Sequence, residues 1–152
     1  MWTARSSPHV GRIEFDGPRR QDGGFFITAT VELDGVEQSV DVEMIEPYRG
    51  DMAGFFADMA THAGGWSGVM SWEAEFSVMR LDARNAGAGQ VALEMMMRWP
   101  PTYDDEWYGS LEVETSSLPR VAAAMKRLLG VEDVSRFMTP NAPPAWQPLP
   151  GR

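Results

Sequence analysis

Alternation of apolar and polar side chains at every second residue is the feature that most limits how this chain can fold. Residues 25–34 and 36–45 both show it, with apolar side chains at every other position. A period of two is typical of a β-strand with one face in a core and the other in water. Asp34-Gly35 stands between the two segments and suits a tight hairpin turn. The pattern recurs in three later segments, residues 72–82, 90–99 and 106–115.

The strand pattern is less regular at two places. Within residues 72–82 the alternation changes phase at Met79, which predicts a β-bulge. Residues 11–15 carry a shorter and weaker alternation, which indicates one further strand near the N-terminus. We therefore expect five to six strands.

Two other segments follow the period of a helix. In residues 51–63, Met52, Phe55, Phe56 and Met59 recur at helical spacing, and Asp51 is a suitable N-terminal cap. Residues 117–129 begin at Ser117, carry Pro119 in the first turn and stop before a glycine. Each segment predicts an amphipathic helix.

The order of these elements predicts an α+β fold. Strand runs joined by short turns favour a single, mainly antiparallel sheet, with the helices on one face and the order (β)ββ-α-βββ-α. We expect residues 1–22 to be loosely structured, residues 23–138 to form one domain, and residues 139–152 to be a proline-rich tail. The predicted core contains Phe55, Phe56, Met59, Leu93, Met95, Leu111, Val113, Val121 and Met125.

Composition excludes several classes of function. The chain has 152 residues and a net charge of -9, which argues against nucleic-acid binding because phosphate needs clustered Lys and Arg. It has no Cys, which excludes disulfides and thiolate metal sites and fits a reducing compartment. It has neither a signal-peptide core nor an apolar run long enough for a membrane helix. We expect a cytoplasmic protein without cofactor, metal or membrane contact.

The most concentrated acids are the run Asp104-Asp105-Glu106, between Tyr103 and Trp107. One interpretation is a solvated turn. Another is a divalent-cation site, although the run lacks the alternate ligand spacing of an EF-hand. The third is an acidic patch with aromatic anchors that faces a basic partner. Alternation places Trp107 on the core face of its strand.

The segment Gly64-Gly65-Trp66-Ser67-Gly68 resembles a functional loop at first sight. It is not a nucleophile elbow, because Val69 stands where the second glycine is required, and it is not a phosphate-binding loop, because no Lys follows. It predicts either a helix stop with Trp66 packed over the core or a recognition loop that presents Trp66. His9 and His62 have no nucleophile or second His nearby in sequence, and we assign no catalytic residue.

A group of short motifs resembles a family of small, uncharacterised bacterial domains. The motifs are Phe55-Phe56, Gly65-Trp66-Ser67-Gly68, Ser71-Trp72-Glu73, the turn 85–89, Tyr103-Asp104-Asp105-Glu106-Trp107 and Leu118-Pro119. The resemblance covers about residues 24–130 and implies a Gly-Trp loop, a Trp-led β-meander and a closing helix. It implies no catalytic residue. Immunity proteins, which neutralise toxins by binding them, are similar in size, acidity and architecture, by analogy only.

These observations favour a non-enzymatic interaction protein that binds a basic partner, with Trp66, Tyr103, Asp104, Asp105, Glu106 and Trp107 as candidate binding residues. The alternative is a small-ligand-binding domain or enzyme with a pocket between sheet and helix, lined by Trp66, Trp72 and Trp107. A third interpretation is a subunit that dimerises through its sheet. Separately, Phe26 and Met96 fall on otherwise polar strand faces, where apolar residues offer a surface for a partner.

Overall fold

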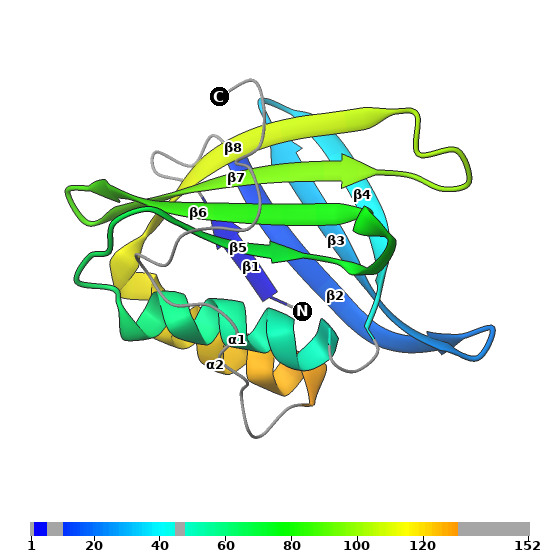
Figure 1. Ribbon diagram of the computed structural model, residues 1–152, viewed down its shortest axis with the longest axis horizontal. Helices are drawn as coiled ribbons and strands as arrows, with labels where there is room; N and C mark the ends of the chain where they lie inside the picture. Colours follow the sequence, from blue (N-terminus) through cyan, green and yellow to red (C-terminus); the bar gives the residue numbers. More distant parts are fainter. Residues whose placement is uncertain (1, 6–10, 45–47, 131–152) are drawn as a thin grey trace.

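A computed structural model describes residues 2–5, 11–44 and 48–130 of the chain. These residues form eight strands in two antiparallel sheets of four, and a helix follows each sheet along the chain (Figure 1). Sheet A contains β1 (Trp2–Arg5), β2 (Gly11–Gln21), β3 (Gly24–Leu33) and β4 (Val36–Glu43). Sheet B contains β5 (Val69–Glu73), β6 (Met79–Gly87), β7 (Gln90–Arg98) and β8 (Glu106–Glu114). The helices are α1 (Tyr48–Thr61) and α2 (Leu118–Leu129).

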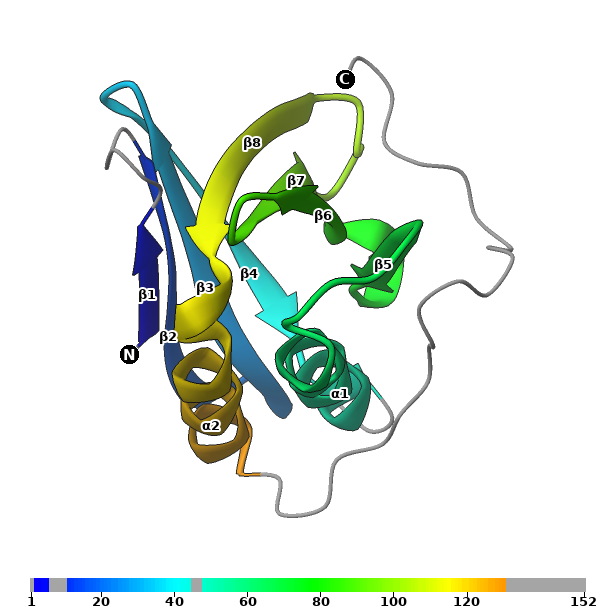
Figure 2. The same ribbon diagram turned by 90° about the vertical axis from the view of Figure 1, so that its left-hand side faces the viewer.

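The α+β class, the antiparallel pairing and the two helices are confirmed, but the prediction of one continuous sheet is wrong. β4 and β5, with α1 between them along the chain, do not pair, and each is an edge strand of its own sheet. The two sheets turn their apolar faces toward a common core, and the paired helices close one end of it (Figure 2). Periodicity identifies the apolar face of each strand but does not say which strands share a sheet.

The prediction of one bulged strand over residues 72–82 is also wrong. The chain reverses there: β5 ends at Glu73, a 3-10 turn spans Glu75–Ser77, and β6 begins at Met79. The amide of Ser77 donates to the carbonyl of Ala74 across this turn, at 3.0 Å. The phase change at Met79 is real, but a hairpin turn causes it.

The N-terminal region contains more strand than expected. The short strand that we expected at residues 11–15, inside a loosely structured segment, is the first half of β2, which continues to Gln21. Ile13 and Phe15 are completely buried there, and Arg12 and Glu14 lie between them on the outer face. β1 adds residues 2–5 at the edge of sheet A and lies beside β8. β2 extends to Gln21 because β3 pairs with it on both sides of a register shift between Asp16 and Arg19, which the short alternation of residues 11–15 does not reveal. The predicted tail, residues 139–152, lies outside the described residues.

The helices lie within three residues of their predicted bounds. α1 begins at Tyr48, so Asp51 lies in its first turn, where a negative charge is favourable, and does not cap it. α2 ends at Leu129 and is capped by Gly130, whose φ of 66° favours glycine. α1 packs against α2 and β5, while α2 packs against β1 and β2. Neither helix of the described ranges is long and apolar enough to cross a lipid bilayer.

All nine predicted core residues are buried. They come from α1, α2, β7 and β8 and join one cluster with apolar side chains of both sheets. Close packing between the sheets is clearest at Gly109 of β8. A Cβ atom at this position would lie 2.6 Å from Cδ1 of Leu33, which comes from β3 of sheet A. Glycine therefore lets the two sheets approach.

Candidate functional site

Five of the six candidate residues lie at one end of sheet B. They belong to the loop 99–105, which joins β7 to β8, and to the first two residues of β8. The turn Glu75–Ser77 between β5 and β6 lies at the same end of the sheet, on the right of Figure 1. We call this region, the turn Glu75–Ser77 with residues 99–107, the acidic–aromatic end.

Arg98, the last residue of β7, ties the parts of this end together. Its Nε donates to the carbonyl oxygen of Ser77 at 3.1 Å, and its backbone amide donates to the carbonyl of Val78 at 2.9 Å. Its Nη1 lies 3.6 Å from Oε1 of Glu106. One arginine therefore connects the β5–β6 turn to the beginning of β8 and fixes their separation.

The loop is also anchored to the other sheet. Nε1 of Trp99 donates to the carbonyl oxygen of Ser39 in β4, at 2.7 Å. The amide of Tyr103 donates to the carbonyl of Trp99 at 3.1 Å, which closes the loop on itself. Trp99 and Tyr103 are partly buried against the core. Because both sheets hold it, the loop presents its acids from a defined position.

The three acids of the run are not equivalent. Glu106 accepts from the hydroxyl of Tyr108 and pairs with Arg98. Asp104 and Asp105 are exposed, and neither has an ion pair with any residue that the structure describes. The run therefore divides into one carboxylate that holds the loop and two that face solvent.

The aromatic residues that flank the run are mainly structural. Trp107 is partly buried on the inner face of β8, opposite Met97, and packs against the core as the alternation predicted. Tyr103 has a φ of 58° and also packs against the core. Both support the loop from beneath while the aspartates project from it.

Trp66 lies elsewhere. It precedes β5, whose first residue, Val69, pairs with Arg84 at the far end of β6 from Met79. Trp66 is partly buried against the core, and its Nε1 is shielded from solvent without a hydrogen-bond partner in the described part of the chain. The structure does not bring Trp66 together with residues 103–107, and it favours the interpretation of a tryptophan packed over the core.

Sequence reasoning missed Phe76. It lies within residues 72–82, which we predicted as one strand, but its side chain is 64% exposed in the β5–β6 turn. Phe76 has a φ of 60° and Ser77 a φ of 54°, in the left-handed region that a bulky residue seldom occupies. The only available signal was the phase change at Met79, which we interpreted as a bulge.

Neither Phe26 nor Met96 forms the exposed apolar surface that the sequence suggested. The guanidinium of Arg19 lies 6.0 Å from the centre of the Phe26 ring, and that of Arg20 lies 5.7 Å from the ring of Phe25. Met96 lies between Arg80 and Tyr108 across sheet B and is only 6% exposed. Neither residue is a large exposed apolar side chain.

Charged groups on the outer face of sheet A form small networks across the strands. Arg19 of β2 lies 2.9 Å from Oδ1 of Asp41 in β4 and donates to Thr28 of β3 at 2.8 Å. Burial by itself would raise the pKa of Asp41. The hydrogen bonds from Arg19 and Thr28, with the positive charge of Arg19, outweigh that effect and lower it. Likewise, the hydrogen bond to Glu32 raises the pKa of Arg12.

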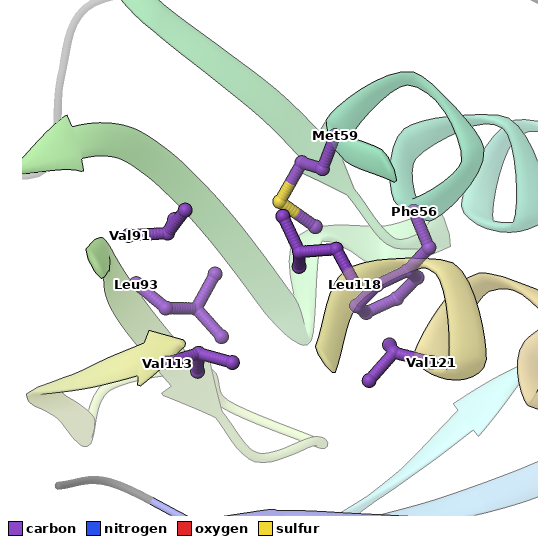
Figure 3. A pocket seen from close by; sticks show the side chains of 7 residues that line it. All are labelled: Phe56, Met59, Val91, Leu93, Val113, Leu118 and Val121. Carbon is purple, nitrogen blue, oxygen red and sulfur yellow. The ribbon is translucent and has the colours of Figure 1, made fainter. Parts of the chain in front are cut away.

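A cavity lies between sheet B and the two helices (Figure 3). Its lining is entirely apolar: Phe56, Met59, Val91, Leu93, Val113, Leu118 and Val121. The space open to the centre of a water molecule is about 10 Å³, near the least that one water needs. A ligand site has several polar groups to orient its ligand and is far larger. Trp66, Trp72 and Trp107 do not line this cavity.

The arrangement of acids does not suggest a metal centre. In the ranges that the structure describes, no three His, Asp or Glu side chains come together as a metal site requires. Asp104 and Asp105 stand side by side on the loop, and the third acid is already held by Arg98 and Tyr108. What the acidic–aromatic end offers is negative charge beside exposed aromatic surface.

Comparison with known proteins agrees with the motifs in the sequence. The model of a family of unknown function, DUF6228, matches residues 4–132. The chain belongs to this family. The match includes β2 to β8, both helices and the end of β1, and it starts before the region of our sequence resemblance. No curated protein matches the chain.

Proposed function

We propose that this member of DUF6228 is a non-enzymatic interaction protein that binds a basic protein partner through its acidic–aromatic end. The observation that supports this most directly is the state of Asp104 and Asp105. Both are exposed, and neither is neutralised by a cation of the described residues. Two carboxylates held in a fixed place on a chain of net charge -9 attract cationic surfaces and speed their encounter.

The architecture supports binding better than catalysis. The loop is held by Arg98 on one side and by the hydrogen bond from Trp99 to Ser39 on the other. It therefore loses little conformational entropy when a partner binds. An immunity-type pairing, in which an acidic domain covers a basic toxin, fits this chemistry. We place this pairing in the cytoplasm, because the chain lacks Cys.

The test compares two variants that each remove two negative charges. Asp104→Asn with Asp105→Asn changes the loop and leaves Glu106 to hold Arg98. Glu112→Gln with Glu114→Gln changes two exposed acids of β8, away from the loop. A partner is captured from native lysate at low salt, and its association rate with each variant is measured at several salt concentrations. We expect the loop variant to associate more slowly and with a weaker salt dependence, because local charge steers the encounter.

Two results would contradict the proposal. Equal rates and equal salt slopes for wild type and loop variant would remove the loop from the interface. A small molecule that raises the melting temperature, in the absence of any captured protein, would favour the ligand-binding alternative. Circular dichroism of each variant checks that the fold is retained.

A further inference from the structure

We infer that the exposed ring of Phe76 binds an arginine side chain of the partner by stacking, so that the acidic–aromatic end binds arginine in preference to lysine. This inference rests on the proposed function and names the chemistry of the partner segment. It begins from the most exposed of the large hydrophobic side chains in the described part of the chain, at 64%. The other exposed large hydrophobic side chain, Val36, is 55% exposed at the first position of β4.

Two other phenylalanine rings near the surface of this protein are each covered by an arginine of the same chain. Phe25 and Phe26 are partly buried, and each has an arginine guanidinium within about 6 Å of its ring centre. A guanidinium is planar and weakly hydrated, so it stacks on an aromatic face better than an ammonium group does. Among the described residues no cation lies over Phe76, although it is more exposed than either of these rings.

The carboxylates of the acidic–aromatic end suit a guanidinium. Glu75 precedes Phe76 in the turn and is partly exposed. Its Oε2 atom is shielded from solvent, so a partner's guanidinium would reach the carboxylate at its other oxygen, through a charge-assisted hydrogen bond. Asp104 and Asp105 add negative charge at the same end of the sheet. A cation is therefore favoured here both by the ring and by the acids.

Arginine satisfies these groups together. Its guanidinium has five N–H donors in one plane, so it can lie on the Phe76 ring while an edge donates to Glu75. A lysine ammonium is a compact, strongly hydrated charge and gains mainly from the acids. Arg98 holds the turn through the carbonyl of Ser77, so the ring and Glu75 stay in place before the partner arrives.

The experiment uses two fluorescent peptides of equal length and charge, nona-arginine and nona-lysine, with the full chain at one ionic strength. The Kd of wild type for nona-arginine should be about twofold to fivefold lower than its Kd for nona-lysine, which corresponds to one exposed cation–π contact. Phe76→Leu keeps apolar area without an aromatic face and should abolish most of this preference. Glu75→Gln should weaken nona-arginine binding more than nona-lysine binding. Val36→Ala, the matched change at another exposed apolar residue, should leave the preference unchanged.

The outcomes separate this inference from the proposed function. If Asp104→Asn with Asp105→Asn weakens both peptides while Phe76→Leu retains the wild-type preference, the acidic loop binds cations and the role of Phe76 is refuted. If neither variant changes the binding of either peptide, both proposals fail. Loss of the arginine preference in Phe76→Leu, with the melting temperature retained, supports the inference.

Discussion

Asp41 shows how a single exposed carboxylate can contribute to stability. It sits on the outer face of β4, where Arg19 and Thr28 both donate to its Oδ1 atom. These donors favour the charged form, so the pKa of Asp41 is lowered although burial opposes this. The residue shows that the polar face of sheet A carries cross-strand bonds of its own.

Asp41→Asn should destabilise the protein near neutral pH, by at most about 1 kcal/mol, because the ion pair is partly exposed. A group with a lowered folded pKa contributes its stability above its unfolded pKa, about 3.9 for Asp. That contribution disappears as the pH falls through the lower folded value. Urea unfolding at a series of pH values from 7 to 3 should therefore show the difference between wild type and variant shrinking below about pH 4.

A control for this experiment is Glu112→Gln, which removes an exposed carboxylate that has no ion pair among the described residues. It should show a smaller change at neutral pH. A stability difference for Asp41→Asn that stays constant down to pH 3 would contradict the assigned cause.

At the scale of one element, β8 displays the alternation that made the strands predictable. Leu111 and Val113 face the core, and Ser110, Glu112 and Glu114 face solvent. The same strand begins at Glu106 in the acidic–aromatic end and finishes beside α2, so it links the candidate site to the core. A change on its buried face should act on stability and a change on its exposed face should not.

Leu111→Ala should cost about 2–5 kcal/mol of unfolding free energy, because Leu111 is only 4% exposed and its loss leaves a cavity. Glu112→Ala, one residue further along the same strand, should change stability by less than about 0.5 kcal/mol. Urea midpoints of the two variants measure this contrast. An unchanged midpoint for Leu111→Ala would show that β8 does not pack as described.

At the scale of the whole molecule, the domain depends on contact between its two sheets. Leu33 of sheet A packs where Gly109 of sheet B has no side chain. The bond from Trp99 to Ser39 joins the sheets a second time, near the proposed binding end. The position of that end relative to sheet A therefore follows from how the sheets pack.

Gly109→Ala should destabilise the protein by about 1–3 kcal/mol, because an added methyl group would displace the side chains of Leu33 and Trp107 that pack there. Gly64→Ala is the matched control: a Cβ atom there would have no heavy atom within 4 Å, and we expect less than about 0.5 kcal/mol. Thermal unfolding of both variants tests this. Equal melting temperatures for the two variants would mean that the sheets are not in close contact at Gly109.

The amino-acid sequence by itself determined most of the local structure. Alternation identified β3, β4, β7 and β8, helical spacing identified α1 and α2, and all nine predicted core residues are buried. Such patterns are readable because the side-chain periods of strand and helix differ, and burial of one face selects apolar residues at that period. The acidic residues of the loop 99–105 could also be identified from the sequence, because they lie between two segments of regular alternation.

Only the tertiary structure decided how these pieces combine. Whether eight strands form one sheet or two depends on pairing between distant segments, which no local period encodes. β2 likewise continues beyond the alternation of residues 11–15 because it pairs with β3 as far as Gln21. The exposure of Phe76 depends on a turn at Glu75–Ser77 that has the same phase change as a bulge. The unequal roles of Glu106 and its two neighbouring aspartates depend on Arg98, which reaches Glu106 only because β7 and β8 pair at that end.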